Sequence, residues 1–365
     1  KRSISVRITE PEVLAAIQKL AAAADIVLAN FRPGMSESLG LDYESVRAMN
    51  PRVIYGENTA YGLEGPMAPL AGMDMALQAL TGLAHMTETG PEPLVNPIID
   101  YAAAMLMAWG VSTALYHRER TRHGQRLNVA LMHAAMFLEN NQLTHVELLD
   151  SWRGEFVRYL KHAFADGKTW ADVIEHRETL LPHKVVRAYY GFHATKDGTV
   201  GVACNARTQR LKLMSLLGID DRWTSEPGWM PEDAHAHADY VYRQVATAFA
   251  QQPTAHWIAA LEERGLPIAP VRHSDQLFFD EQVKANNFLA EVEHEVLGPI
   301  KVVAPPLRMT ETPLAARPPV PLGKNSREVL LEAGLSTQQV DELFARGLVR
   351  EVHELFAAAD LHLDR

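Results

Sequence analysis

The sequence predicts an α/β fold, in which a large domain with a Rossmann-like parallel sheet is joined to a smaller α+β domain. Three observations predict it: strands alternate with helices over the first 60 residues, a hairpin pattern appears near residue 190, and 365 residues exceed a typical single core. We expect the large domain at 1–137, a linker at 138–185, the small domain at 186–305, and at 306–365 a return linker and C-terminal helices that pack on the large domain.

The large domain opens with an alternation of strands and helices. The strand pattern SISVRI is followed by the helical pattern PEVLAAIQKLAAAA, the buried strand DIVLAN, the helix DYESVRAMN and the strand RVIYGENTAYG. Further helices are expected at 72–85 and from Tyr101 to about Arg120, then a strand and a helix in GQRLNVALMHAA. This order is typical of a parallel sheet with right-handed crossovers, and we expect the first strand to belong to it.

The rest of the chain has a different character. Residues 138–185 show a weak pattern with scattered Trp, Arg and His, which predicts an extended linker. The stretch AYYGFHATKDGTVGVAC predicts a hairpin with a Lys-Asp-Gly turn, and helices follow at about 207–217, 239–251 and 253–264. Prolines in PPLRMTETPLAARPPVPLGKNS predict a return linker, and SREVLLEAG and STQQVDELFARG predict two more helices.

Composition argues against several classes of protein. The formal net charge is -10 and no clustered basic face is visible, so we expect no nucleic-acid partner. We expect no membrane span and see no signal peptide, because no run of 18 or more apolar residues lacks a charge or turn former. The single cysteine, Cys204, lies in the apolar stretch TVGVACNA, which predicts an inert core thiol and fits a reducing, cytoplasmic location.

One carboxylate stands out in NPIIDYAAAMLMAWG, because Asp100 is the only charge at the start of a long apolar helix. Two explanations are open. Aspartate is a good N-cap, where its oxygens accept hydrogen bonds from the free amides of the first turn. The same amides and the helix dipole favour the anion, and an ionised carboxylate beside an apolar helix can attack a thioester or another activated acyl group.

Two stretches predict ligand contact at the carboxyl edge of the sheet, where open α/β sheets bind small molecules. In NFRPG, beginning at Asn30, Arg32 could pair with a phosphate and Phe31 could face a base or sugar, although a Pro-Gly turn with a surface arginine explains the same residues. The stretch YGLEGPMAPLAGMDMALQALTG is rich in glycine and proline, which suits a loop close to a ligand or an ordinary linker.

Two histidines suggest a metal site by their spacing. His235 and His237 lie in DAHAHAD, but no third ligand is nearby in the sequence. We therefore expect a solvated loop there and no metal in the protein.

Taken in order, these stretches resemble the family III CoA-transferases, the CaiB/BaiF superfamily that includes formyl-CoA transferase and carnitine CoA-transferase. The similarity covers nearly the whole chain and is weakest between about 138 and 230. It indicates the superfamily and not the substrate. The stretches are KRSISVRI, ADIVLANFRPGMSESLGLDYESVRAMNPRVIYGENTAYGLEGP, AGMDMALQALTG, PIIDYAAAMLMAWGVSTALYHRERTRHGQRLNVALMHAA and GLPIAPVRHSDQLFFDEQVKANNFLAEVEHEVLGPIKVVAPPLRMTETP.

The resemblance implies an enzyme that moves CoA from an acyl-CoA thioester to a carboxylic acid acceptor, without a metal. In the family, an aspartate at the position of Asp100 forms a mixed anhydride with the donor acyl group, and then an aspartyl-CoA thioester that the acceptor carboxylate displaces through a second anhydride. Asp74 matches an acidic position of the family pocket. The residues implied to contact CoA are Val6, Arg7, Ile8, Thr9, Asn30, Phe31, Arg32, Ala71, Gly72, Met73 and Asp74.

The sequence departs from the family pattern in four places. Ser38 stands where many members have arginine, and Ala71 where some have lysine. The second domain has no run of glycines like the one that covers the formyl-CoA transferase site. Members normally have a strand and a helix ahead of KRSI, so we expect either that the chain is part of a longer protein or that its activity is affected.

Two other functions are compatible with the same fold. An α-methylacyl-CoA racemase moves an α-proton between a His/acid pair and an aspartate, but Met73 stands where its histidine would be and cannot take a proton. An inactive acyl-CoA-binding protein is the other. The resemblance also implies an interlocked homodimer, and linkers at 138–185 and 305–325 are consistent with it.

Overall fold

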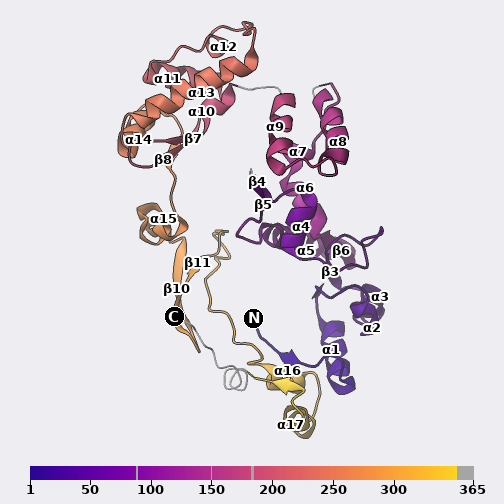
Figure 1. The fold of residues 1–365 in the computed structure, drawn as a ribbon. Helices are drawn as coiled ribbons and strands as arrows, with labels where there is room; N and C mark the ends of the chain where they lie inside the picture. The colour runs from indigo at the N-terminus through magenta and orange to yellow at the C-terminus, as the bar shows by residue number, and fades with distance from the viewer. Residues whose placement is uncertain (88, 149, 182–184, 352–365) are drawn as a thin grey trace. The chain divides into compact units, whose positions relative to one another are not determined.

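The computed structural model describes residues 1–87, 89–148, 150–181 and 185–351, and Figure 1 labels most of their helices and strands. The chain divides into two compact units. The first unit comprises Lys1–Thr179, Val292–Ile300 and Arg317–Arg365, and the second unit comprises Leu180–Glu291 and Lys301–Ala316. Each unit is therefore built from segments that are distant in the sequence.

A parallel sheet lies in the first unit, with its described strands in the order β2-β3-β6. Strand β2 (Ile26–Ala29) pairs with β3 (Ile54–Thr59), and β3 pairs with β6 (Gln125–Ala130), both in parallel. Helices α2 (Met35–Ser38) and α3 (Tyr43–Met49) connect β2 to β3. The predicted α/β class with a parallel sheet is confirmed, and the carboxyl ends of the strands meet at one edge.

Helix α1 (Pro11–Ala23) and helix α3 pack with the sheet around a common core. Pro11 suits the first position of α1, where its missing N–H would have had no partner inside the helix. Asp42 caps α3 by accepting hydrogen bonds from the amides of Glu44 and Ser45, at 3.0 and 3.1 Å. The buried members of this core are Ala21, Ala29, Leu39, Leu41, Val46, Val53 and Tyr55.

A second core joins helices α4 (Asp74–Thr81), α5 (Ile98–Thr121) and α6 (Leu131–Leu138). Helix α5 is long and apolar enough to cross a membrane, a property that it shares with core helices of soluble proteins. One of its faces is buried, while Tyr101, Met105, Trp109 and Tyr116 are exposed. The buried residues of the core are Leu77, Ile99, Ala102, Ala103, Leu131, Ala134 and Ala135.

The first strand lies outside the parallel sheet. Strand β1 (Ser5–Val6) pairs antiparallel with β12 (Val349–Arg350), and the Arg7 amide donates to the Leu348 carbonyl at 2.8 Å. Helices α1, α16 (Ser326–Glu332) and α17 (Thr337–Ala345) enclose this pair in a third core. The prediction that the first strand joins the parallel sheet is wrong, because an alternating pattern indicates a strand without indicating its partner.

The extended linker predicted at 138–185 is wrong for the described residues of that range. They contain α7 (Asn140–Leu143), α8 (Ser151–Ala163) and α9 (Trp170–Leu180). Aromatic rings pair between these helices, with the centroids of Tyr159 and His176 3.9 Å apart and those of Phe164 and Trp170 4.7 Å apart. Charged and polar side chains are frequent in α8 and α9, so neither stretch stands out as apolar in the sequence.

The second unit has the predicted hairpin. Strand β7 (Tyr190–Ala194) pairs antiparallel with β8 (Thr199–Ala203), which also pairs with β9 (Ile268–Pro270). The thiol of Cys204 is buried directly after β8, and burial raises its pKa to about 11, as an inert core thiol requires. The other elements are α10 (Val186–Tyr189), α11 (Arg207–Leu217), α12 (Arg222–Ser225), α13 (Ala234–Ala250), α14 (Thr254–Glu262), η1 (Ser274–Phe279) and α15 (Glu281–Asn286).

The two histidines considered as metal ligands lie in a helix and not in a solvated loop. Both are in the first turns of α13, whose N-cap Asp233 accepts from the His235 and Ala236 amides, each at 2.9 Å. The Nε2 atom of His237 lies 2.8 Å from Oδ1 of the buried Asp221. The loop prediction failed because Asp233 is an N-cap, which begins a helix that the sequence pattern placed five residues later.

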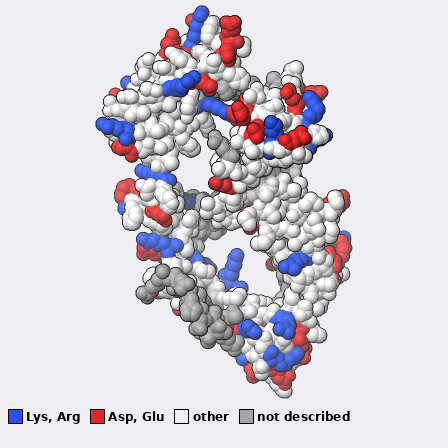
Figure 2. All heavy atoms as spheres, viewed as in Figure 1, with Lys and Arg blue, Asp and Glu red and all other residues white. Residues whose placement is uncertain are grey.

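Two small antiparallel pairs complete the described strands. Strand β4 (His85–Thr87) pairs with β5 (Gly90–Glu92), and β10 (Leu289–His294) pairs with β11 (Gly298–Val303). On the face that Figure 2 shows, basic and acidic side chains are interspersed, with wide uncharged areas between them.

Candidate active site

Two adjoining cavities lie at the carboxyl edge of the parallel sheet, as open α/β sheets favour. The arginine cavity, about 570 Å³, is lined by Arg32 and Arg126, and the aspartate cavity, about 910 Å³, is lined by Asp74 and Asp100. Residues after β2, at the end of β3, ahead of α4 and after β6 form the wall between them. The residues that line both cavities are Asn30, Asn58, Ala71, Gly72, Met73 and Leu131.

Asp100 is the third residue of α5, and its side chain is exposed in the aspartate cavity. The amides of the first turn bind another acid, because those of Ile99 and Asp100 donate to Oδ2 of Asp74 at 2.8 and 3.1 Å. No hydrogen bond among the described residues involves the Asp100 carboxylate. The N-cap explanation of Asp100 is therefore wrong, and Asp74 has that role from the start of α4.

Two hydrogen bonds through the buried Gln78 side chain hold Asp74 in place. Its Oδ1 atom accepts from Nε2 of Gln78 at 2.5 Å, and Oε1 of Gln78 accepts from the Leu94 amide at 2.8 Å. Asp74 is 8% exposed and Gln78 is 1% exposed. These bonds join α4 to the segment that leads into α5, so they fix the turn that carries Asp100.

The environment of Asp100 raises its pKa above the ordinary aspartate range. Partial burial is the main cause, and the negative charge of Asp74 adds to it. A carboxylate that accepts hydrogen bonds from free helix amides is expected to have a lowered pKa. The pKa of Asp100 is raised instead, because those amides donate to Asp74. A more basic carboxylate is a stronger nucleophile once it is ionised.

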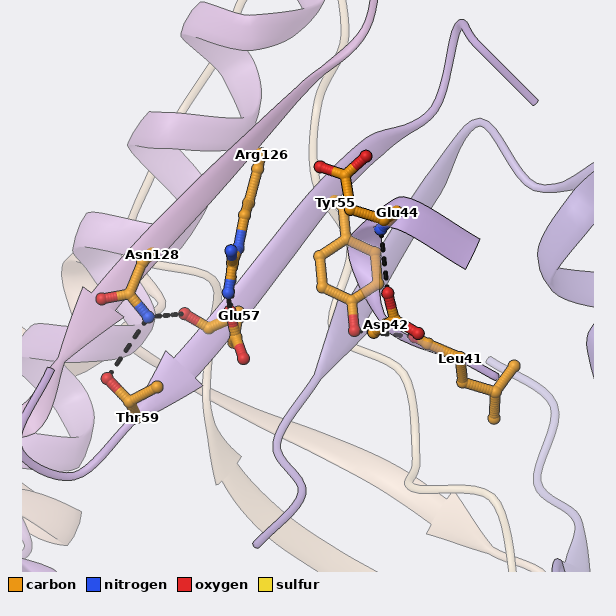
Figure 3. A network of polar contacts seen from close by, with 8 residues as sticks. All are labelled: Leu41, Asp42, Glu44, Tyr55, Glu57, Thr59, Arg126 and Asn128. Carbon is orange, nitrogen blue, oxygen red and sulfur yellow. Dashed lines mark hydrogen bonds and ion pairs between the residues drawn. The ribbon is translucent and has the colours of Figure 1, made fainter. Parts of the chain in front are cut away.

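Two of the charged residues that line the arginine cavity, Glu57 and Arg126, come from the neighbouring strands β3 and β6 (Figure 3). Nε and Nη2 of Arg126 donate to Oε2 of Glu57 at 3.1 and 2.5 Å, and this bonding raises the pKa of Arg126. Asn128 Nδ2 donates to the Glu57 carbonyl and to Oγ1 of Thr59, each at 3.2 Å. Arg32 is exposed and has no ion-pair partner among the described residues, so its guanidinium is available to an anion.

Seven of the predicted contact residues line one or both cavities and four do not. Strand β1 pairs with β12 and not with the sheet edge, so Val6, Arg7, Ile8 and Thr9 line neither cavity. Val6 and Ile8 pack instead against apolar cores of the first unit. The residues that line the cavities are Asn30, Phe31, Arg32, Ala71, Gly72, Met73 and Asp74.

Sequence reasoning missed several cavity residues. Asn58 lies at the carboxyl end of β3, where the argument used for Asn30 also applies, and its Oδ1 is buried without a partner among the described residues. Gln78 follows Asp74 by one helical turn, so the spacing of the two residues could have indicated it. Nothing in the sequence near Glu57 or Arg126 indicates that they pair.

The described residues give no sign of a metal site. Within the described ranges, no group of three or more His, Cys, Asp or Glu side chains could hold a metal ion. That the protein works without a metal stays a prediction.

A free carboxylate in one cavity and an arginine-lined cavity beside it suit an enzyme that transfers an acyl group from a large anionic carrier. The chain matches the family described as CoA-transferase family III over residues 1–326. It therefore belongs to this family, and the protein is a transferase. The resemblance of its sequence motifs to this family is confirmed.

Relatives of the chain carry transferase names. The chain is 27% identical over 370 residues to succinyl-CoA:glutarate CoA-transferase of Mus musculus, covering 97% of this chain and 77% of the relative. It is 28% identical over 341 residues to succinate–glutarate CoA-transferase of Agrobacterium fabrum, covering 91% and 78%. It is 27% identical over 359 residues to the beta subunit of succinyl-CoA–L-malate CoA-transferase of Chloroflexus aurantiacus, covering 96% and 82%.

Solved structures share the fold. A CaiB/BaiF family protein from Brucella suis superposes with a TM-score of 0.65 at 26% identity, covering 91% of this chain and 82% of that one. The hypothetical protein Rv3272 of Mycobacterium tuberculosis gives a TM-score of 0.70 at 24% identity, covering 90% and 83%. Both confirm the predicted fold class.

Proposed function

We propose that the protein moves CoA from an acyl-CoA thioester to a free carboxylic acid, and that Asp100 carries the acyl group and then the CoA. The observation that supports this most is the Asp100 carboxylate, which is free of hydrogen bonds among the described residues and lies in a cavity of about 910 Å³. The amides that would otherwise bind it are occupied by Asp74.

The proposed cycle has four acyl transfers and no net proton change. An Asp100 oxygen attacks the thioester carbonyl, the C–S bond breaks, and CoA leaves as a thiolate. The thiolate attacks the Asp100 carbonyl of the anhydride, which releases the donor acid and leaves an aspartyl-CoA thioester. The acceptor carboxylate then attacks this thioester, and the released thiolate finally takes the acceptor acyl group from the second anhydride.

The two cavities divide the substrate between them in this proposal. Arg32 has no ion pair among the described residues and would meet a phosphate of CoA, with Phe31 beside it in the arginine cavity. Asn58 lies in the wall that both cavities share, which the pantetheine arm would cross between Arg32 and Asp100. The thioester would then lie in the aspartate cavity beside Asp100.

The alternatives have less support. A racemase needs a proton carrier where Met73 stands, and this thioether is 77% exposed and lines both cavities. An inactive acyl-CoA-binding protein would leave Asp100 unmodified by an acyl-CoA. The experiment below separates it from a transferase.

Trapping with hydroxylamine tests the proposal. The protein is mixed with an acyl-CoA, treated with hydroxylamine, digested, and analysed by mass spectrometry. We expect a hydroxamate at Asp100, because both the anhydride and the thioester react with this amine. An unmodified Asp100 in a protein that turns over, or full turnover by Asp100→Asn, would refute the assignment.

We also propose an interlocked homodimer that works in the cytoplasm. Exposed apolar side chains in one row on a helix are typical of a protein interface, and α5 presents Tyr101, Met105, Trp109 and Tyr116. The reduced, buried Cys204 is compatible with the cytoplasm. Light scattering should give twice the chain mass of 40.6 kDa, and a monomer at micromolar concentration would contradict the dimer.

A further inference from the structure

We infer that the acids exchanged at Asp100 are apolar monocarboxylic acids, and that a second carboxylate on the acyl group is disfavoured. This inference rests on the proposed function. It concerns the aspartate cavity, where the acyl group would lie next to its nucleophile. Three properties of that cavity support the inference: the sign of its charges, the polarity of its walls, and the position of the nearest arginines.

The titratable side chains among the described residues that line the aspartate cavity are both acidic. They are Asp74 and Asp100, and no lysine, arginine or histidine lines this cavity in the described part of the chain. A second carboxylate on the substrate would approach two acids in a partly desolvated space, without a cation to offset the repulsion.

The walls around Asp100 are mostly apolar, with the amides of Asn30, Asn58 and Gln78 as the neutral polar groups among the described residues. Met73, Met75, Leu94, Val95, Pro97 and Leu131 line the cavity, and Met75 and Val95 are 67% and 99% exposed. An alkyl chain laid over these side chains removes apolar surface from water on both partners. Gln78, which also lines the cavity, has its amide nitrogen and oxygen bonded to Asp74 and to the Leu94 amide.

Among the described residues of the two cavities, the positively charged side chains line the arginine cavity. Arg32 and Arg126 line the arginine cavity and not the aspartate cavity. Arg126 is bonded to Glu57, which leaves Arg32, among the described residues that line this cavity, as the cation available to the phosphates of the carrier. The site thus separates an anionic carrier from an uncharged acyl chain. The names of the relatives described above, which share 27–28% identity with this chain, contain dicarboxylic acids instead.

An exchange reaction tests the inference without knowledge of the natural acceptor. The full chain is given butanoyl-CoA with isotopically labelled butanoate, or succinyl-CoA with labelled succinate, and label entering the thioester is measured. We expect kcat/KM for butanoate exchange to exceed that for succinate at least tenfold. Equal or faster succinate exchange would overturn the inference while supporting the proposed function. No exchange of either acid would overturn both.

A charge variant tests the physical cause. Met75→Lys places a cation in the aspartate cavity, and Met75→Gln is its uncharged control. We expect the butanoate preference to fall at least fivefold in Met75→Lys and to persist in Met75→Gln. A folded Met75→Lys protein that exchanges butanoate and gains nothing for succinate would contradict the electrostatic argument.

Discussion

The carboxylate of Asp74 accepts a hydrogen bond from the backbone amide of Asp100, at 3.1 Å, as well as one from Ile99. One acid therefore caps the helix that carries the other. Asp74 acts on Asp100 through its backbone, which makes it a positioning residue, while the oxygens of Asp100 stay available for chemistry. The charge of Asp74 also adds to the burial that raises the pKa of Asp100.

We expect Asp100→Asn to abolish CoA transfer without lowering the melting temperature. The amide cannot form the anhydride. Because the pKa of Asp100 is raised in the folded state, any stability from this group is present at low pH and is lost as pH rises through that pKa. At pH 7 the ionised Asp100 carboxylate therefore adds nothing to the stability of the fold, and replacing it with asparagine should not lower that stability. Calorimetry and an acyl-CoA assay measure the two effects.

Asp42→Ala is the matched control, because Asp42 is a true N-cap outside both cavities. Its loss should cost about 1 kcal/mol of stability with little change in turnover. The reverse pattern, in which Asp42→Ala loses turnover and Asp100→Asn keeps it, would contradict the assignment of the nucleophile.

We expect Asp74→Asn to move the acid limb of the kcat/KM profile to lower pH. Asparagine removes the negative charge that adds to the raised pKa of Asp100, while the effect of partial burial remains. A profile recorded from pH 4 to 8 measures the shift. A purely structural role would lower the rate at every pH and leave the limb in place.

The same variant should lower stability. The new amide group faces Nε2 of Gln78, a donor, so Gln78 must turn and give up the Leu94 amide. We expect a loss of about 1–3 kcal/mol in the free energy of unfolding, measured with urea. An Asp74→Asn protein as stable as the native one would show that the hydrogen bonds from Asp74 through Gln78 to Leu94 do not contribute to stability.

We expect Gly72→Ala to disturb the loop shared by both cavities. A Cβ at Gly72 would lie 2.7 Å from Cβ of Ala60 and 3.0 Å from Cδ2 of Leu77. Such overpacking typically costs about 1–3 kcal/mol and should also raise KM for the acyl-CoA. Gly154→Ala in α8 is the control, because its nearest neighbour is the flexible end of Arg158 at 3.6 Å. It should be neutral or stabilise slightly.

The second unit should lose stability as pH falls below about 6.5, in part through His193. Burial against Phe249 and Tyr242 lowers the pKa of His193 below 6.5, so the unfolded chain binds the proton more readily than the folded one. Stability is therefore lost between pH 6.5 and the lowered folded value. His193→Gln should show a smaller loss than the native protein between pH 7.5 and 5.5, and the exposed His256→Gln should behave like the native protein.

Cys204 should be inert in the folded protein. Burial raises its pKa to about 11, so almost no thiolate is present at pH 8. We expect no reaction with a thiol-specific disulfide reagent at that pH, and one equivalent of reaction after unfolding in guanidinium. Rapid labelling of native protein would show that the thiol is accessible.

The sequence predicted features that depend on neighbours along the chain. Apolar periodicity indicated β2, β3, β6 and the helices between them, and the Lys-Asp-Gly turn indicated the β7–β8 hairpin. The residues after β2 were predicted at the ligand edge and lie there, because parallel strands place their carboxyl ends together. Asp100 was noticed because an isolated charge in an apolar stretch is visible in the sequence itself.

The tertiary structure decided features that depend on residues far apart in the sequence. Asp74, 26 residues before Asp100, accepts the hydrogen bonds at the start of α5. Strand β1 pairs with β12 and not with the parallel sheet. Glu57 accepts hydrogen bonds from Arg126 on the neighbouring strand. A hydrogen bond between such residues depends on where the folded chain brings them, which no local period encodes. The sequence thus determined which groups could react, and the packing of distant segments decided that Asp74, and not Asp100, accepts the first amides of α5.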